Sequence, residues 1–380
     1  MKQKIIRACT VSLSFIFLER MILELQKKYE VILLSSPGSE LDEMERKYGV
    51  QGKRVPMERH ISLFYDLVSL LHLIQTFLKE KPTMVHSMTP KAGLLCMIAA
   101  WLTRVPVRVH TFTGLVFPTA TGLKRRILML TDSITCACAT HVIPEGEGVM
   151  KDLRNHGITK KPMKVLGYGN IKGVDMMHYS RRPEVMELAQ KLKKEGVFTF
   201  LFVGRIAKDK GINELCTAMG KLSGFAPVRL LLVGWNEDCQ DPISQEAKEM
   251  IENNSALEYV GGKYGNELLA YYAAADCFVL PSYREGFPNT VLEAGAMGLP
   301  SIVTDINGSR EIIIEGENGV IVPPRNEETL FQAMLEMVRN KSKREYMASQ
   351  ARDLIASRFE QSFVQKCLLD FYEEILKPYK

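Results

Sequence analysis

Residues 199–222 decide the fold of this chain, and they read TFLFVGRIAKDKGINELCTAMGKL. Residues 200–203 of this stretch are apolar on both faces, as a strand of a parallel sheet covered by helices requires. A glycine-containing loop follows, and residues 213–222 have the apolar spacing of an amphipathic helix. The same unit of strand, loop and helix repeats along the chain, which predicts parallel sheets flanked by helices.

Strands and helices of this kind are predicted along almost the whole sequence. In the first half we expect strands at residues 5–11, 31–35, 84–88, 107–112, 141–144 and 164–168. In the second half we expect them at residues 199–203, 229–233, 257–260, 277–280 and 300–304. Helices are expected at residues 64–78, 93–103, 213–222, 245–253, 266–273, 291–297 and 327–339, with a helical tail over residues 341–376.

Two such sets predict an α/β chain with two doubly wound, Rossmann-like domains. The length of 380 residues also favours about two domains. The pattern breaks between residues 169 and 196, so we expect domains at residues 1–175 and 176–360. Residues 361–380 are expected to form a helix that packs back on the first domain. Two such parallel sheets should face a cleft, and ligands should bind where the carboxyl ends of the strands open into it.

The composition is that of an ordinary globular protein, with 46% hydrophobic and 24% charged residues. Eight cysteines are present, and only Cys136 and Cys138 lie close together, in a spacing that is not typical of zinc sites. Buried thiols in a reducing cytoplasm are the simplest interpretation. Neither disulfides nor a metal site are therefore expected.

Charge is distributed unevenly along the chain, although its net value is only +5. Residues 1–175 hold 25 Lys and Arg against 15 Asp and Glu, and the remainder is acidic on balance. The first half is therefore expected to face an anionic partner: a membrane surface, a phosphorylated substrate or nucleic acid. The alternative is that these cations simply solvate helix surfaces.

The N-terminus resembles a signal peptide in its apolar residues 8–18, but Glu19 and Arg20 end that stretch and no small-residue cleavage site follows. The longest apolar run elsewhere, residues 92–102, is about half the length of a membrane span. We therefore expect a cytoplasmic protein that is soluble or bound only to the surface of the membrane.

The loop after residue 203 carries the first chemical signal. No dinucleotide-binding, P-loop, nucleophile-elbow or zinc motif is found in the chain. Arg205 instead offers a planar fork of donors and Lys210 a point charge, which together can neutralise a diphosphate leaving group. Gly204 lets the backbone approach a ligand closely. The alternative is a solvated loop with a lysine-rich tip.

The second signal lies in residues 280–294, which read LPSYREGFPNTVLEA. A strand is expected to end at residue 280 and a helix to start near Asn289, after Pro288. The backbone N–H groups at this helix start predict an anion site, and they belong to Phe287, Asn289, Thr290 and Val291. Glu285 and Glu293 lie eight residues apart, so one carboxylate can meet a sugar while the other meets a ribose. Each glutamate alone can instead be a solvated or capping residue.

These motifs resemble those of retaining glycosyltransferases of family 4, which have the GT-B architecture. Residues 285–293 match the family's E-x7-E pattern, and residues 203–211 resemble its G-R-x-x-x-x-K-G phosphate loop. Residues 275–282 and 298–319 also look like the family. The resemblance covers nearly the whole chain.

The resemblance implies a nucleoside-diphosphate sugar, usually a UDP-sugar, in the second domain, with no cofactor and commonly no metal. It assigns the diphosphate to Arg205 and Lys210, the donor sugar to Glu285 and the ribose to Glu293. Its donor-binding residues also include Gly204, Val260, Gly286, Phe287, Pro288, Asn289 and Thr290. The reaction retains the anomeric configuration and needs no carboxylate nucleophile.

The first domain resembles transferases that extend polyprenyl-diphosphate-linked sugars in capsule, O-antigen and other glycan biosynthesis. Its acceptor-side residues are expected to be Ser12, Ser14, His110, Thr113 and Gly114. Many relatives have a glycine pair where Ser12 and Ser14 stand, and a histidine where Thr113 stands. His110 has the alternative of simple strand packing.

A lipid-linked acceptor in an anionic leaflet explains the basic first half. Residues 124–126 (Lys-Arg-Arg) and the apolar helix over residues 61–78 are candidates for the membrane-facing surface. Alternatively, the apolar residues of that helix form only core; they include Leu67, Leu70, Leu71 and Ile74.

Two other functions remain open: a UDP-sugar 2-epimerase of similar two-domain shape, and a non-catalytic module that binds an anionic surface. Nucleic acid is not expected as a partner, because no aromatic residues are interleaved with the basic runs.

Overall fold

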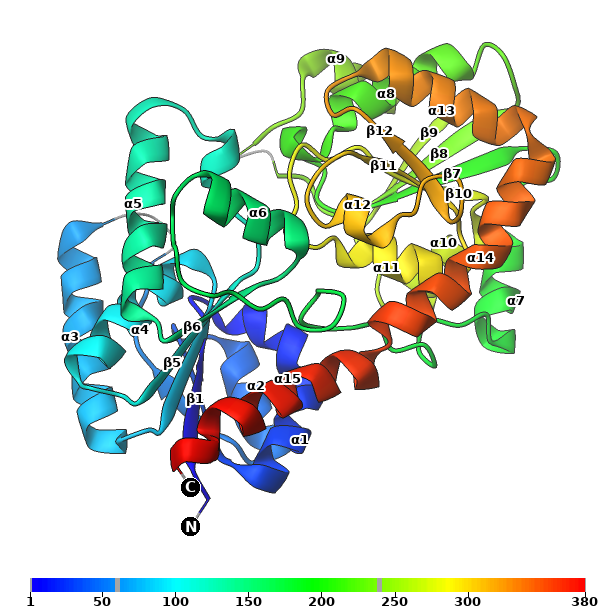
Figure 1. The fold of residues 1–380 in the computed structure, drawn as a ribbon. Coiled ribbons are helices and arrows are strands. Elements are labelled where there is room, and N and C mark those ends of the chain that lie inside the picture. Colours follow the sequence, from blue (N-terminus) through cyan, green and yellow to red (C-terminus); the bar gives the residue numbers. More distant parts are fainter. Residues whose placement is uncertain (1, 59–61, 238–240, 380) are drawn as a thin grey trace. The chain divides into compact units, whose positions relative to one another are not determined.

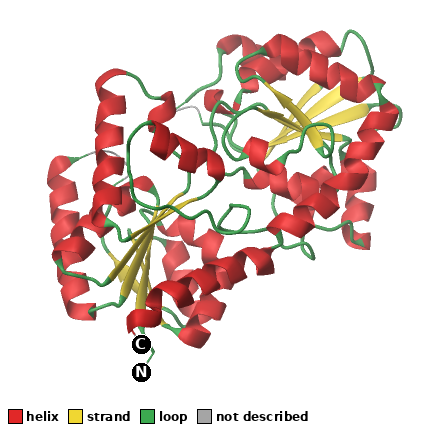
Figure 2. Cartoon of the chain, in the orientation of Figure 1, coloured by secondary structure: helices red, strands yellow, loops and turns green. Residues whose placement is uncertain are grey.

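The computed structural model describes residues 2–58, 62–237 and 241–379. The chain forms two compact units. Unit 1 contains Met1–Lys172 and Ser362–Lys380, and unit 2 contains Gly173–Gln361. Each unit is built on one six-stranded sheet whose strands are all parallel, with helices on both faces (Figures 1 and 2).

Unit 1 has the strand order β3-β2-β1-β4-β5-β6. Its strands are β1 (Lys4–Ala8), β2 (Glu30–Ser35), β3 (Gln51–Arg54), β4 (Met84–Met88), β5 (Val107–Phe112) and β6 (His141–Pro144). Its helices are α1 (Glu19–Lys28), α2 (Ser39–Tyr48), α3 (Leu63–Glu80), α4 (Pro90–Leu102), α5 (Gly122–Cys138), α6 (Glu147–Asn155) and, from Ser362 onward, α15 (Gln361–Leu376). Short 3-10 segments lie at Ser12–Leu18 and Phe117–Thr119.

The sheet of unit 1 separates two apolar cores, because alternate residues of each strand face opposite sides. Ile6 and Ile32 pack with residues of α3, α4 and α5 on one face. Ile5 and Leu33 pack with residues of α1, α2 and α15 on the other. Helix α15 therefore completes the second face, although it is the last helix of the chain (Figure 1).

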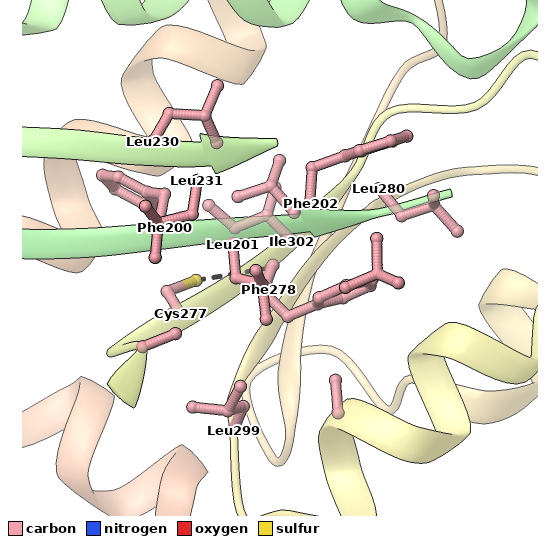
Figure 3. Packing of buried hydrophobic residues seen from close by; sticks show 14 of the residues in the cluster. Phe200, Leu201, Phe202, Leu230, Leu231, Cys277, Phe278, Leu280, Leu299 and Ile302 are labelled. Carbon is pink, nitrogen blue, oxygen red and sulfur yellow. Dashed lines mark hydrogen bonds between the residues drawn. The ribbon is translucent and has the colours of Figure 1, made fainter. Parts of the chain in front are cut away.

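Unit 2 has the strand order β12-β11-β10-β7-β8-β9. Its strands are β7 (Phe198–Val203), β8 (Val228–Val233), β9 (Leu257–Gly261), β10 (Cys277–Leu280), β11 (Ser301–Thr304) and β12 (Gly319–Val322). Its helices are α7 (Pro183–Leu192), α8 (Ile212–Leu222), α9 (Gln245–Asn253), α10 (Gly265–Ala274), α11 (Asn289–Ala296), α12 (Ser309–Ile312), α13 (Glu327–Arg339) and α14 (Lys341–Phe359). Figure 3 shows the core of this unit around Phe200, Phe202 and Phe278.

The predicted α/β class with two parallel sheets is confirmed, and the expected bounds of β4, β5, β6 and β10 are those observed. A strand over residues 164–168 was a wrong prediction, since Gly167 and Gly169 adopt positive φ angles and the segment turns. Two strands were missed. They are β3, which is polar throughout, and β12, and each lies at an edge of its sheet.

Two further expectations need correction. The first strand ends at Ala8, not at residue 11, and the chain then enters the 3-10 segment Ser12–Leu18. The helical tail is not continuous, because Glu360 has an extended backbone that separates α14 from α15. Helix α15 is fixed to the sheet of unit 1 by the buried Arg7, whose Nη1 donates a hydrogen bond to the Tyr372 hydroxyl at 2.7 Å.

The cysteines that the structure describes are all free thiols, and Cys239 lies outside the described residues. Burial raises the pKa of the Cys9 and Cys216 thiols to about 12, so both stay protonated at neutral pH.

Candidate functional site in unit 2

The loops after β7 and β10 lie against each other at the carboxyl edge of the unit 2 sheet. Tyr283 N–H donates to the Asp209 carbonyl at 2.8 Å, which joins the two loops. Gly211 has a φ of +72°, and a Cβ atom there would lie 2.1 Å from the carbonyl oxygen of Pro281. Only glycine allows this approach, so the glycine in the K-G pair of the first motif holds the second motif in place.

Lys210 and Glu285 form the centre of this arrangement. Lys210 Nζ lies 2.5 Å from Glu285 Oε1, and the Ser282 hydroxyl donates to the same oxygen at 2.8 Å. Each of the two charged side chains is 15% exposed, so the pair is shielded but still reaches solvent. The structure thus brings together two charged residues that lie 75 positions apart in the sequence.

Arg205 lies beside this pair and is more open, with 45% of its side chain exposed. Its Nη1 donates to Glu237 Oε2 at 2.8 Å, and its Nη2 lies 3.4 Å from the Asp209 carboxylate. Burial lowers the pKa of Arg205, but the carboxylates of Glu237, Asp209 and Glu285 raise it by more, so its pKa is above the ordinary value. Arg284 also reaches Asp209, at 3.3 Å.

The site therefore holds cations paired with carboxylates, and its chemistry suits an oxygen-rich dianion. The guanidinium of Arg205 and the ammonium of Lys210 present charge-assisted donors at the end of one strand. A diphosphate that displaced the carboxylate partners would accept hydrogen bonds from both cations. Sequence reasoning identified the cations but missed Glu237 and Ser282, because neither residue belongs to the phosphate loop.

The turn before α11 is tightly packed against the loop that precedes α12. Gly308, with a φ of +75°, would place a Cβ atom 2.5 Å from the Gly286 carbonyl oxygen. Phe287 is buried and its ring lies 5.4 Å from that of Phe359. The backbone amides of this turn are thus held in fixed positions, as an anion-binding turn requires.

Helix α11 begins at Asn289, with Pro288 as its N-cap and Thr290 in its first turn. The expectation that Val291 offers a free N–H group is wrong, because this group donates to the Pro288 carbonyl at 3.1 Å. The tight first turn uses that donor, so the predicted anion site is smaller by one N–H group.

Glu293 lies in the second turn of α11 and is only 8% exposed. Its Oε2 accepts a hydrogen bond from the buried Tyr272 hydroxyl at 3.0 Å, and Tyr179 also interacts with it. Burial, together with the charge of Glu293, raises the pKa of Tyr272 well above its ordinary value, so Tyr272 remains a donor. The two tyrosines orient the second glutamate of the E-x7-E pattern, and no sequence motif predicted either of them.

Gly204 directly follows β7 and Val260 lies at the end of β9, so both belong to the carboxyl edge of the unit 2 sheet. Gly234, with a φ of +148°, would place a Cβ atom 1.7 Å from the Gly204 carbonyl oxygen, so the loops after β7 and β8 touch. Beyond them, Trp235 is exposed and donates through Nε1 to the Tyr264 hydroxyl at 3.0 Å. This aromatic pair lies next to the loop that follows Val260, and sequence reasoning missed it.

The predicted acceptor-side residues of unit 1 fall into two places. His110, Thr113 and Gly114 line one small cavity at the carboxyl edge of the unit 1 sheet, together with Asp132 of α5. Burial raises the pKa of Asp132 to about 7 and lowers that of His110 to about 3. His110 also packs tightly in the sheet, where its Nδ1 lies 2.9 Å from the Ser87 hydroxyl.

Ser12 and Ser14 do not line that cavity; they lie in the 3-10 segment after β1. The buried Ser12 hydroxyl donates to Glu40 Oε2 at 2.6 Å, which fixes the loop to α2. Thr10, which follows β1, and Thr89, which follows β4, join the loops after these two strands, since their hydroxyls lie 2.7 Å apart. Thr89 has a φ of +69°, an unusual conformation for a β-branched residue, just before α4.

Comparison with known proteins links both units to sugar transfer. Residues 186–354 match the family model "Glycosyl transferases group 1", and residues 17–169 match "Glycosyl transferase 4-like domain". The capsular polysaccharide biosynthesis glycosyltransferase CapM of Staphylococcus aureus is 32% identical over 378 residues, which cover 99% of this chain and 98% of that protein.

Two more similarities extend this finding. An Escherichia coli enzyme, UDP-Gal:alpha-D-GlcNAc-diphosphoundecaprenol alpha-1,3-galactosyltransferase, is 28% identical over 74% of this chain and 73% of its own length. The crystal structure of Anabaena HepE in complex with UDP superposes with a TM-score of 0.80 over 98% of this chain and 100% of that chain, at 18% identity, and shows the same fold. The chain therefore belongs to the family 4 glycosyltransferases and has the GT-B fold that its motifs predicted.

Proposed function

We propose that this chain is a retaining glycosyltransferase that transfers a hexose or N-acetylhexosamine from a UDP-sugar to a polyprenyl-diphosphate-linked saccharide. The observation that carries the proposal is the grouping of Arg205, Lys210 and Glu285 at one edge of the unit 2 sheet. These are the residues that the phosphate loop and the E-x7-E pattern supply. The relatives with similar sequences support the same reaction class.

In this proposal, Arg205 and Lys210 bind the diphosphate of the donor and stabilise the negative charge that develops as it leaves. Glu285 accepts hydrogen bonds from the hydroxyls of the donor sugar. Glu293, oriented by Tyr272, accepts those of the ribose. The UDP bound to the Anabaena structure supports uracil as the base, which would lie near Val260 and its following loop.

The proposed step breaks the bond between the anomeric carbon and the diphosphate oxygen, and forms a bond from that carbon to the acceptor oxygen on the same face of the sugar. The acceptor hydroxyl gives its proton to the leaving diphosphate oxygen, so the products are UDP and a saccharide that is one sugar longer. Glu285 is not a nucleophile in this scheme, since its Oε1 is held by Lys210 and Ser282. The two cations carry the charge stabilisation, so no metal is needed.

The acceptor is proposed to be a lipid diphosphate because the E. coli relative, by its name, acts on a diphosphoundecaprenol-linked sugar. The S. aureus relative, by its name, serves capsular polysaccharide biosynthesis, and we propose a capsule or O-antigen role here. Within the described residues, no helix is long and apolar enough to cross a membrane. We propose that the chain acts as a peripheral protein on the inner face of the cytoplasmic membrane.

The test is a donor screen with a short polyprenyl-diphosphate monosaccharide as acceptor, read by mass spectrometry. The proposal expects one UDP-sugar to add its sugar mass to the acceptor and to release UDP. Conversion of the UDP-sugar to an epimer without any added mass on the acceptor would establish the 2-epimerase alternative instead. No turnover of any nucleotide sugar, together with binding of anionic surfaces, would leave the non-catalytic alternative.

A further inference from the structure

Helix α3 is apolar on the face that does not pack on the sheet. Ser69, Leu73 and Phe77 are its buried residues and face the core. The opposite stripe consists of residues at helical spacing that are exposed to solvent: Leu63 (86%), Phe64 (71%), Leu67 (56%), Leu71 (52%) and Leu78 (57%). A helix that only covers a sheet should carry polar residues on this stripe, so the composition calls for a second apolar or interfacial partner.

The sequence left open whether the apolar residues of this helix face a membrane or form only core. If the helix were only core, Leu67, Leu70, Leu71 and Ile74 would all be covered. Leu70 and Ile74 do pack against the core, but Leu67 and Leu71 are more than half exposed. Residue 61, where this apolar helix was expected to begin, lies outside the described residues, and the observed helix begins at Leu63.

Helix α5 continues the same kind of surface. Both α3 and α5 pack against α4, and all three helices cover one face of the sheet (Figure 1). Exposed apolar residues recur on α5 at Leu123, Ile127 and Leu130, and the C-terminal end of α4 adds Trp101 and Leu102. We call the exposed apolar residues of α3 and α5, with the exposed cations on these two helices, the α3–α5 face.

The charges of this face are of one sign. Exposed cations lie on α3 and α5 at Lys79, Lys124 and Arg126. None of the acidic residues of α3, α4 or α5 is among the exposed residues, all three helices lying in the described part of the chain. Asp66 pairs with Lys91 at 2.6 Å, and Glu80 pairs with Lys4 and Lys53.

We propose that the α3–α5 face lies on the surface of an anionic lipid bilayer, with its leucines and Phe64 in the interface and its cations among the headgroups. Apolar side chains on one surface with an excess of Lys and Arg are the pattern of interfacial helices. A second copy of the chain is a poorer partner, because a two-fold contact would bring Lys124 and Arg126 of both copies to the same interface. This inference rests on the proposed lipid-linked acceptor and names the surface that would reach it.

The position of the face within unit 1 fits that acceptor. Helix α3 follows β3 and α5 follows β5, so both helices begin at the carboxyl edge of the parallel sheet. The inner side of α5 lines the cavity of His110 and Thr113 through Leu128 and Asp132. The outer side of the same helix carries Leu123 and Ile127. One helix thus connects the predicted acceptor side with the proposed lipid contact.

The test is flotation of the full chain with vesicles of equal parts phosphatidylglycerol and phosphatidylcholine, and with pure phosphatidylcholine vesicles. We expect the wild type to float with the anionic vesicles and less with the neutral ones. The double variant Phe64→Glu, Leu67→Glu should partition roughly a hundredfold less, since each apolar side chain contributes about a tenfold factor. Lys124→Glu, Arg126→Glu should lower binding to the anionic vesicles roughly tenfold or more.

A matched control is Met177→Glu, Phe225→Glu, which places the same charges at two exposed apolar positions of unit 2. It should float like the wild type, and thermal unfolding should show all variants folded. The proposal is overturned if the wild type does not float with anionic vesicles, or if the control loses as much binding. A dimer that the Phe64 and Leu67 variant abolishes, without vesicle binding, would assign the face to a second copy. Flotation needs neither donor nor acceptor, so its outcome is independent of whether sugar transfer is found.

Discussion

Replacement of Lys210 by methionine is the sharpest perturbation of the proposed donor site. Methionine keeps most of the apolar stem and removes the charge that lies 2.5 Å from Glu285. A unit charge about 4 Å from the developing charge of a leaving diphosphate contributes roughly 4 kcal/mol at an effective dielectric constant of about 20. Because about 1.4 kcal/mol corresponds to a tenfold change in rate, we expect kcat to fall by roughly a thousandfold.

The assay is the initial rate of UDP release with saturating donor and acceptor, accompanied by thermal unfolding. The fold should survive, at a cost of roughly 1 to 3 kcal/mol for leaving Glu285 without its cation. Lys221→Met is the matched control, since Lys221 of the same unit pairs with Glu327 and Glu328 on an exposed surface. A folded Lys210→Met variant with a kcat within about threefold of the wild type would refute the charge-stabilisation role.

Three further predictions follow from single residues or conditions. Glu293→Gln should weaken UDP binding, measured by titration calorimetry, more than it lowers kcat; equal UDP affinity in both proteins would remove the ribose role. A chelator should leave the transfer rate unchanged, because the proposed charge stabilisation comes from Arg205 and Lys210; lost activity that Mg²⁺ or Mn²⁺ restores would show a metal requirement. Asp132 has a pKa near 7 in the folded chain and 3.8 as its ordinary value, so the folded state binds the proton more tightly and stability should fall as pH rises from about 4 to above 7. Asp132→Asn should remove this loss, worth roughly 2 to 4 kcal/mol, and identical pH slopes of the melting temperature in both proteins would contradict it.

The strands that the sequence predicted well share one physical property. β4 and β10 are buried on both faces; β10 is apolar throughout, and β4 is interrupted only by the buried polar residues His86 and Ser87, so the ends of both strands are sharp. The edge strand β3 was missed because Gln51–Arg54 is polar and has a neighbouring strand on one side only. The false strand over residues 164–168 arose from apolar residues whose neighbouring glycines turn the backbone.

The candidate site was predictable where its residues lie close together in the sequence. Arg205 and Lys210 share one loop, and Glu285 and Glu293 share one turn and helix, so short motifs identify them. Their partners are tertiary. Tyr272, for example, reaches Glu293 from a different helix, and no spacing along the chain encodes that contact.

The exposure of helix faces was also beyond the sequence. The apolar residues of α3 have nearly continuous helical spacing, which is compatible with a buried helix or with one that has two partners. Only the packed structure shows that Leu63, Phe64, Leu67 and Leu71 lie outside the core.

The stereochemistry of the new glycosidic bond tests the central claim most directly. The product formed from a UDP-α-sugar and the lipid-diphosphate acceptor can be isolated, and its new anomeric centre examined by NMR through the one-bond carbon–proton coupling. Retaining transfer by the Arg205, Lys210 and Glu285 site predicts an α-linked sugar on the acceptor. A β-linked product would contradict the proposed same-face reaction, and an acceptor without any new anomeric signal would contradict sugar transfer itself.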